Sequence, residues 1–246
     1  MILSGKTILI TGAGSGIGLD TAKLLASKGN RVIITGRKPE KLKKAVEGLE
    51  NITAMTSDIT VAEDVKELVA RITAEFGSLN VLINNAAVSS VYSHGQNSEA
   101  FEKATEELLT NYLSVIRLNE KFLPLLSAQT EAAIVNVTSV VSFLPVGIIP
   151  TYSDSKAALH SYTITLRRTL AKDTSIRVFE LLPPLVNTEF TKAIGGETNG
   201  MPPIQVAQAL IDGIENNEEE IYVGAAKELY NLYASNPLEA LNIINQ

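Results

Sequence analysis

The sequence predicts an α/β fold in which a doubly wound parallel sheet is covered by helices on both faces. Short apolar runs and amphipathic segments alternate along the chain, the pattern of repeated strand–helix–strand units. A glycine-rich loop follows the first apolar run, and polar residues follow several later ones. Ligands bind such sheets beyond the carboxyl ends of the strands, so these residues should line one edge. No linker or repeat divides the chain, and we expect a single domain spanning residues 1–246.

The first half of the chain opens with a buried strand at residues 7–10, because this short apolar run ends in the glycine loop. A helix over residues 17–27 should stop at Gly29-Asn30. The helix expected at 61–76 has apolar residues at helical spacing, which gives it one buried face. The remaining elements expected here are strand 31–35, helix 39–49, strand 52–55 and strand 81–83.

The second half begins with a long helix over residues 101–126, expected to be bent or frayed near Pro124. The same alternation of apolar runs and amphipathic segments continues to the end of the chain. It predicts strand 133–137, helix 151–171, strand 176–182, helix 206–214 and strand 221–223.

Composition narrows the function classes. Hydrophobic residues make up 45% of the chain, which suits a folded soluble core, and the net charge of −6 argues against nucleic-acid binding. The chain has no cysteine, which excludes disulfides and thiolate catalysis, and two histidines are too few for a histidine-rich metal site, so no metal is expected. No apolar run reaches the ~18–20 residues that cross a bilayer, and the start of the chain lacks signal-peptide features. We expect a cytoplasmic protein with no membrane association.

The glycine loop is suited to a phosphate-bearing cofactor. The strict G-x-G-x-x-G spacing is absent; Gly12 is followed by three residues ending in Ser15, and then by Gly16-Ile17-Gly18. Glycines permit the tight turn and let backbone N–H groups approach a pyrophosphate, while the helix N-terminus adds positive potential. An ordinary glycine-rich turn is the alternative, but the position directly after the first strand favours a dinucleotide.

The end of the second strand bears on which dinucleotide fits. Enzymes that use NAD usually place a carboxylate there for the ribose 2′-hydroxyl, whereas Arg37 and Lys38 could hold a 2′-phosphate. We therefore predict NADP(H) as the preferred cofactor, with NAD(H) possible; solvated loop charges are the alternative. Asp58 follows the third strand and could bind the adenine amino group or cap the segment at Thr60.

Tyr152 and Lys156 stand four residues apart, so one helical turn places a phenol and an ammonium on the same face. Ser139, at the end of the preceding strand, can hydrogen-bond a substrate oxygen. To act near pH 7 the tyrosine needs a pKa about 2–3 units below its usual ~10, and the lysine charge would lower it. His160, one turn further on, is expected in packing or at an interface, and His94 in an exposed loop.

These motifs resemble the short-chain dehydrogenase/reductase family over essentially the whole chain. Thr11 to Gly18 is similar to that family's T-G-x-x-x-G-x-G loop, and the run from Asn84 to Ala87 looks like its N-N-A-G motif, with alanine where glycine is usual. The resemblance implies that Asn85 and Ala86 lie along the cofactor. It also implies a Rossmann fold with seven strands.

The resemblance assigns further roles. Asn111 matches an asparagine implied to anchor a water that relays protons to the lysine, and Ser139, Tyr152 and Lys156 match the other catalytic positions. Both Tyr152 and Lys156 would also contact the cofactor, and Lys156 would hold its ribose hydroxyls. The implied homodimer or homotetramer would form through helices 101–126 and 151–171.

The segment after the sixth strand is similar to the family's P-G-x-V-x-T, in which Pro183, Val186 and Thr188 would meet the nicotinamide side of the cofactor. Pro184 replaces the usual glycine, which removes a backbone donor and restricts Pro183. Residues 189–201 should form a mobile segment that closes over the substrate. An apolar pocket is expected around Phe143, Leu144, Val146 and Phe190.

Together these features predict an NADP(H)-dependent oxidoreductase that interconverts a carbonyl and a secondary alcohol of a small molecule, with Tyr152 as general acid and base. One alternative is a non-catalytic NADP(H)-binding regulator or redox sensor on the same fold. A structural partner protein that binds no dinucleotide is the other. The intact set of four catalytic positions favours the enzyme.

Overall fold

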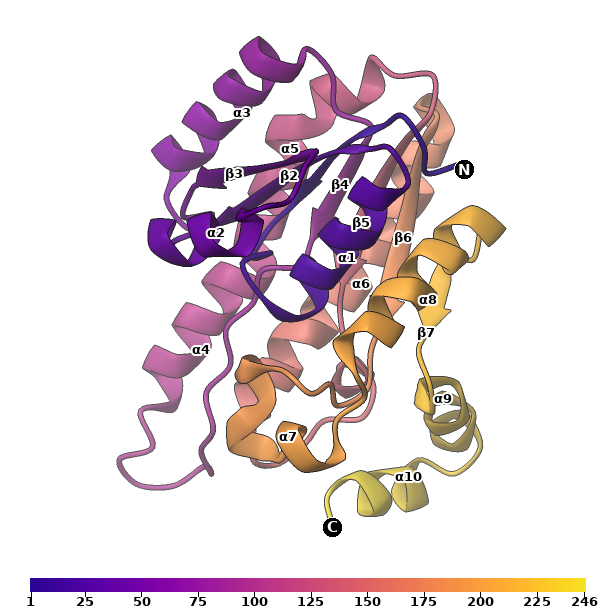
Figure 1. The fold of residues 1–246 in the computed structure, drawn as a ribbon. Helices are drawn as coiled ribbons and strands as arrows, with labels where there is room; N and C mark the ends of the chain where they lie inside the picture. Colours follow the sequence, from indigo (N-terminus) through magenta and orange to yellow (C-terminus); the bar gives the residue numbers. More distant parts are fainter.

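A computed structural model describes residues 1–246, and its centre is a seven-stranded sheet with strand order β3-β2-β1-β4-β5-β6-β7 (Figure 1). Every pair of neighbouring strands is parallel. The predicted α/β fold and doubly wound sheet are therefore confirmed. The strands are β1 (Thr7–Ile10), β2 (Arg31–Gly36), β3 (Ile52–Thr56), β4 (Val81–Asn84), β5 (Ala132–Val137), β6 (Ile176–Leu182) and β7 (Glu220–Tyr222).

Both faces of the sheet are buried because helices cover each of them (Figure 1). Along β1, Ile8 and Ile10 pack on the side of α1 (Gly16–Ser27) and α8 (Pro203–Asn216), whereas Leu9 packs on the side of α3 (Ala62–Phe76) and α5 (Ser114–Ser127). Leu9 pairs in register with Ile33 and Leu82. This continuous burial explains why the strands read as apolar runs instead of alternating.

The remaining helices lie around this core: α2 (Pro39–Val46), α4 (Ala100–Leu108), α6 (Pro150–Asp173), α7 (Gly196–Asn199), α9 (Ala226–Ser235) and α10 (Pro237–Ile244). From β1 the chain adds β2 and β3 toward one edge of the sheet, and from β4 it adds β5, β6 and β7 toward the other edge. The direction therefore reverses between β1 and β4. A crevice opens beyond the carboxyl ends of strands at such a switch point. None of the helices is both long and apolar enough to cross a bilayer.

The long helix expected at 101–126 is interrupted. α4 ends at Leu108, a π-helical segment spans Leu109–Leu113, and α5 continues to Ser127 with Pro124 inside it. The expected irregularity near Pro124 was therefore placed wrongly, because the helix continues through Pro124 and the break in hydrogen-bond pattern lies after the nine residues of α4, about two turns into the helix, and contains Asn111. Such π segments are rare and are frequent at functional sites.

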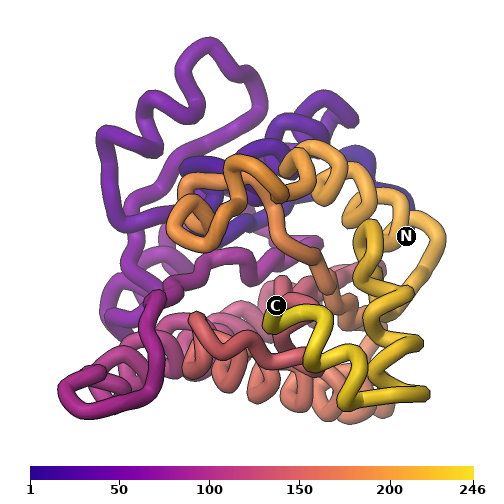
Figure 2. Tube along the Cα trace, turned by 90° about the horizontal axis from the view of Figure 1, so that it is seen from below, coloured from indigo at the N-terminus to yellow at the C-terminus, as the bar shows by residue number.

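Two C-terminal helices, α9 and α10, were not expected from the sequence. Asn236 caps α10 by accepting a hydrogen bond from the Glu239 backbone, and Pro237 occupies the first helical position. These residues are recognisable start signals. Residues 189–201, expected as a mobile loop, contain a 3₁₀ helix (Glu189–Ile194) and α7. In Figure 2 the end of the chain lies near the centre, between the segments around residues 145 and 190.

Candidate active site

A cavity of about 940 Å³ opens beyond the carboxyl ends of the strands. Its wall is built from the loops that follow β1, β2, β3, β4, β5 and β6, as the strand order predicts. Fourteen of the sixteen residues predicted for the site line it; Gly18 and Asn111 do not. The lining set is Gly12, Ser15, Gly16, Ile17, Arg37, Asp58, Asn85, Ala86, Ser139, Tyr152, Lys156, Pro183, Val186 and Thr188.

The glycine loop has a backbone that side chains would disrupt. Gly12 has φ +64°, and a Cβ there would lie 2.6 Å from the Cα of Ala86. A Cβ on Gly18 would lie 2.6 Å from the Asn85 side-chain nitrogen, so Gly18 is required for packing and does not face the cavity. Ser15 precedes α1 without capping it, which leaves the first N–H groups of the helix free of side-chain partners.

Thr11, which begins the loop motif but was not predicted as a site residue, joins this loop to the end of β4. The Thr11 hydroxyl accepts hydrogen bonds from the backbone N–H groups of Asn85 and Ala86, both at 3.1 Å. The Asn85 amide donates in return to the carbonyl oxygens of Thr11 (2.9 Å) and Gly12 (3.2 Å). These bonds hold the two loops in a fixed relation, so they form one floor of the cavity.

The end of the cavity beside β2 and β3 carries polar groups without protein partners. Arg37 is exposed and takes part in no ion pair. The buried hydroxyls of Thr35 and Ser57 have no hydrogen-bond partner, although both residues line the cavity. Asp58 accepts from the Thr60 N–H at 2.9 Å with one oxygen, so its local capping contact is present, and it also faces the cavity.

The segment after β6 is ordered despite Pro184. Val186 forms a bridge with Met201, whose N–H donates to the Leu185 oxygen at 2.9 Å and whose oxygen accepts from the Asn187 N–H at 2.8 Å. Both contacts bypass residue 184, so the donor that proline lacks is not needed here. The Pro183 oxygen accepts from the Val140 N–H at 3.1 Å and thereby ties this segment to the end of β5.

Lys156 is 2% exposed in α6, and its ammonium donates to the Val137 oxygen at 2.7 Å. The Lys156 nitrogen lies 5.6 Å from the centre of the Tyr152 ring, which confirms that one helical turn brings the two side chains together. Burial lowers the pKa of Lys156 to about 7, against the opposing effect of the Glu180 charge. The lysine can therefore change its protonation state near neutrality.

Tyr152 is 9% exposed, and its ring packs against Phe190 at 5.7 Å between centroids. Burial, followed by the negative charge of Glu107, raises the pKa of the Tyr152 phenol. This direction is opposite to the lowering that acid–base work near pH 7 requires. The difference arises because burial removes water from the phenol and the Glu107 charge further disfavours the phenolate, two effects that the spacing of Tyr152 and Lys156 does not reveal.

Ser139 follows β5 and places its hydroxyl on the cavity wall. That oxygen accepts from the Val141 N–H at 3.3 Å and lies 3.5 Å from the Pro183 oxygen. Both contacts are at the long end of the hydrogen-bond range, so the hydroxyl can turn toward a better partner at little cost.

The Asn111 side chain connects two segments of the chain by hydrogen bonds. Its amide donates to the Val88 oxygen and to the Ser155 hydroxyl, each at 2.9 Å, while its own oxygen accepts from the Val88 N–H at 2.9 Å. The side chain is fully buried and bridges the loop after β4 to α6. Every hydrogen of its amide is in use, so the side chain has no donor left for a water.

Glu107 is a buried acid that sequence reasoning missed. It is fully buried in α4 and accepts hydrogen bonds from the Ser90 N–H at 2.6 Å and from the Thr151 hydroxyl. It therefore links α4 to the start of α6, next to Tyr152. The signal available in the sequence was an acidic residue on the apolar face of the expected helix.

The wall opposite the glycine loop is apolar, and Val146, Ile148, Phe190, Leu229 and Ile244 contribute to it. Two of these, Leu229 and Ile244, come from the C-terminal helices.

Two other residues expected in the apolar pocket lie elsewhere, and that part of the prediction was wrong. Leu144 is fully buried behind the wall, and Phe143 packs on Tyr230 with 5.3 Å between centroids. For Phe143 the cause is α9, which carries Tyr230 and was not expected from the sequence.

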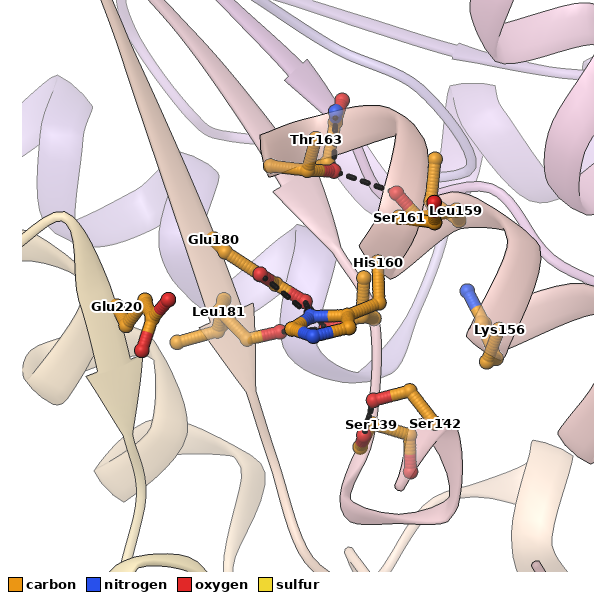
Figure 3. A network of polar contacts seen from close by, with 12 residues as sticks. Ser139, Ser142, Lys156, Leu159, His160, Ser161, Thr163, Glu180, Leu181 and Glu220 are labelled. Atoms are coloured by element: carbon orange, nitrogen blue, oxygen red, sulfur yellow. Dashed lines mark hydrogen bonds and ion pairs between the residues drawn. The ribbon is translucent and has the colours of Figure 1, made fainter. Parts of the chain in front are cut away.

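The two histidines lie outside the cavity. His94 is exposed and makes an edge contact with Tyr92 at 5.5 Å. His160 is not simply packed: its Nδ1 lies 2.8 Å from a carboxylate oxygen of the buried Glu180 (Figure 3). The hydrogen bond with Glu180 raises the pKa of His160.

Comparison with known proteins relates this chain to one family. The family model described as short chain dehydrogenase matches residues 6–199. The uncharacterized oxidoreductase DltE of Bacillus subtilis (strain 168) is 37% identical over 232 residues, which cover 90% of this chain and 89% of the relative. An uncharacterized oxidoreductase of Staphylococcus aureus (strain MW2) is 31% identical over 221 residues, with 85% and 91% covered.

Solved structures agree with these relatives. A short chain dehydrogenase from Burkholderia cenocepacia J2315, crystallised in complex with NADP, has a TM-score of 0.88 and 26% identity, with the whole of each chain covered. A Burkholderia phymatum short chain dehydrogenase/reductase in complex with NAD, at 23% identity and a TM-score of 0.82, shares the fold. The family match spans most of the chain, and the chain therefore belongs to the short-chain dehydrogenase family of oxidoreductases, as its motifs predict.

Proposed function

We propose that this oxidoreductase uses NADP(H) to interconvert a carbonyl and a secondary alcohol, with Tyr152 as general acid and base. The observation that carries the proposal is a single cavity that joins the glycine loop to the buried pair Tyr152 and Lys156. Ser139 stands on the wall of the same cavity. A nucleotide seated on the loop would therefore extend toward the only buried phenol–ammonium pair that faces this space.

The residues present fit a dinucleotide. Gly12 lets the loop lie directly against the Ala86 backbone, and the first N–H groups of α1, which have no side-chain cap, follow the loop where a pyrophosphate would lie. The buried Thr35 and Ser57 hydroxyls lack partners and would gain them from the nucleoside end of the cofactor. When bound, the nicotinamide supplies or accepts the hydride at the substrate carbon.

Preference for NADP(H) follows from Arg37, which is exposed at the cavity edge and free of carboxylate partners. Guanidinium groups bind phosphate in a forked geometry. Lys41, which also lines the cavity edge, is held by Glu189 at 2.7 Å and is less available. The short chain dehydrogenase from Burkholderia cenocepacia was crystallised with NADP, which supports the same assignment.

In the proposed reduction, Ser139 donates a hydrogen bond to the substrate oxygen and Tyr152 gives it a proton; oxidation reverses both steps. The weak contacts of the Ser139 hydroxyl allow it to turn to that oxygen. Lys156, as an ammonium, favours the phenolate form of Tyr152 and so lowers the pKa that burial has raised. With its own pKa near 7, Lys156 makes this assistance dependent on pH.

The substrate is proposed to be an uncharged, largely apolar carbonyl compound. The wall beyond Tyr152 is formed by aliphatic and aromatic side chains, among them Val146, Ile148 and Phe190. Ile148 and Phe190 are also substantially exposed, so the apolar surface continues to the mouth of the cavity. A carboxylate carried deep into this wall would lose its hydration without gaining a cationic partner.

The first experiment measures oxidation of NADPH with neutral methyl ketones of increasing chain length and with keto acids of equal length. Tyr152→Phe should lower kcat by at least about a hundredfold, the contribution usual for a general acid. Tyr233→Phe, whose hydroxyl makes no hydrogen bond in the protein, is the matched control and should keep its activity. Turnover that survives in Tyr152→Phe would contradict the proposed role.

Cofactor preference is tested by titrating NADPH and NADH into the wild type and Arg37→Asp. Loss of a charge-assisted contact of ~1.5–3 kcal/mol should reduce the ratio of NADPH to NADH affinity by about tenfold or more. An unchanged ratio would show that Arg37 does not determine the preference for NADP(H), and it would not contradict the proposed carbonyl reduction.

A non-catalytic NADP(H)-binding regulator is the second candidate, and one observation favours it: burial raises the pKa of Tyr152 away from the range useful near pH 7. It predicts NADPH binding with no carbonyl reduction at any pH. A structural partner protein predicts no change in NADPH fluorescence on mixing with the protein. The ketone series and the titration together separate the three.

A further inference from the structure

Glu180 is a carboxylate in the middle of an apolar strand. It lies in β6 with Val178 and Leu182 two residues away on the same face, and its side chain is 0% exposed. Removing a carboxylate from water is costly unless charged or hydrogen-bonding groups replace the water. The groups around Glu180 therefore indicate what the residue does.

Two side chains satisfy this carboxylate. The Thr138 hydroxyl donates to one oxygen at 2.6 Å, and His160 Nδ1 lies 2.8 and 3.0 Å from the two oxygens. Thr138 directly precedes Ser139 at the end of β5, and His160 lies one helical turn after Lys156 on α6. Figure 3 shows Glu180 against His160, with Lys156 and Ser139 nearby. Glu180 thus connects both elements that carry the proposed catalytic groups.

The same carboxylate acts on two cations. Its charge opposes the effect of burial on Lys156, and its hydrogen bond raises the pKa of His160. Of the other charged groups around His160, Glu220 on β7 acts in the same direction and Arg167, further along α6, acts against it. Lys156 itself is anchored on the Val137 oxygen, one residue before Thr138. Glu180 is therefore linked by hydrogen bonds to the two elements that hold Lys156, and its negative charge favours the ammonium form of that buried lysine.

We propose that Glu180 is a positioning residue that keeps Lys156 cationic and aligns the end of β5 with α6, and that protonated His160 competes for its charge. When His160 is neutral, the full carboxylate charge supports the Lys156 ammonium. When His160 carries a proton, the pair is neutral and that support weakens. The consequence for catalysis rests on the proposed function, whereas the charge relation between the three residues does not.

The direct test is NMR titration of the cofactor-free protein. With only two histidines in the chain, His94→Gln identifies the His160 imidazole signal, and Lys156→Arg identifies the Lys156 signal in protein labelled with ¹⁵N-lysine. Glu180→Gln keeps the size and removes the charge. Both titration midpoints should fall by about one pH unit or more, the effect of losing a neighbouring opposite charge.

Thr138→Val is the matched control, since it removes a hydrogen bond to the same carboxylate but leaves the charge. The Lys156 midpoint should stay in place in this variant. A Lys156 midpoint that is equal in Glu180→Gln and the wild type overturns the proposal, and so does an equal shift in Thr138→Val, which would assign the effect to structure alone.

His160→Gln covers the case in which Glu180→Gln does not fold. The amide can still donate to Glu180 but never carries a charge, so the carboxylate is no longer shared and the Lys156 midpoint should rise. An unchanged midpoint there also overturns the proposal. In turnover, the alkaline limb of the kcat/KM profile for ketone reduction should move to lower pH in Glu180→Gln by the shift that NMR records. Absence of ketone turnover in the wild type would refute the proposed function and leave the titrations to decide this inference.

Discussion

Lys156→Met should change how the stability of the cofactor-free protein depends on pH. The wild-type lysine is buried, and its pKa falls from the ordinary value of 10.5 to about 7. At about 1.4 kcal/mol per pH unit, this fall corresponds to a penalty of at most about 5 kcal/mol whenever the folded protein holds the charge. Methionine has a similar length and no charge, so the variant does not carry this penalty.

The sign of the effect follows from proton binding. Between about pH 7 and 10.5 the unfolded chain keeps a proton that the folded protein has released, so the wild-type free energy of unfolding rises with pH across that window. Below about pH 7 the lysine is protonated in the folded protein as well, so the folded state carries the full cost of the buried charge. From pH 6 to 9.5 the wild type should gain up to about 3 kcal/mol relative to Lys156→Met. The lost hydrogen bond to Val137 adds an offset that does not vary with pH.

Urea unfolding of both proteins at several pH values measures this difference. Lys172→Met, an exposed lysine on the same helix, is the matched control and should follow the wild type at every pH. If the free energy of unfolding depends on pH in the same way in the wild type and in Lys156→Met, burial does not penalise the charge of this lysine. The assignment of its depressed pKa, and with it the pH dependence proposed for the site, would then be refuted.

Three further changes have defined outcomes. Gly12→Ala should lower stability by at least about 1–2 kcal/mol in chemical unfolding and weaken NADPH binding, because its φ of +64° is left-handed and the new Cβ meets Ala86; normal binding would contradict the loop's role. Asn245→Ala removes the oxygen that accepts from the Gly147 N–H at 2.8 Å, so hydrogen exchange in α10 should accelerate while global stability changes by under about 1 kcal/mol; unchanged exchange would show that this side chain does not hold α10 in place. Phe101→Asp should dissociate the expected homodimer or homotetramer in sedimentation equilibrium, since this α4 side chain is 79% exposed; an unaltered assembly would place the interface elsewhere.

Sequence patterns located the strands and the cavity because both depend on local signals. β1, β4 and β5 are buried on both faces, and such strands are visible as short apolar runs. The residues within the glycine loop are close to one another in sequence, and so are Tyr152 and Lys156. In each case the spacing of the residues therefore predicts how they lie relative to one another. These are the features for which expectation and structure agree.

Other features depend on contacts between distant segments. Thr11 meets Asn85 across two strands, and Glu180 meets His160 across a strand and a helix, so neither pairing has a local signal. The pKa of Tyr152 rises because the assembled core excludes water from it, which residue type and spacing do not encode. α10 had readable start signals at Asn236 and Pro237, whereas α9 begins without a capping side chain, and its omission misplaced Phe143, which packs on Tyr230.

The π segment Leu109–Leu113 couples two regions that would otherwise vary independently. A π turn holds one residue more than an α turn, and each residue of an α-helix turns the chain by about 100°. Deleting one residue here would rotate α4, with its protruding Phe101, against the helix that follows, and would displace Asn111 from Val88 at the same time. Insertions and deletions at this point should thus move the exposed Phe101 surface and the buried Asn111 together, so the chain length here fixes both at once.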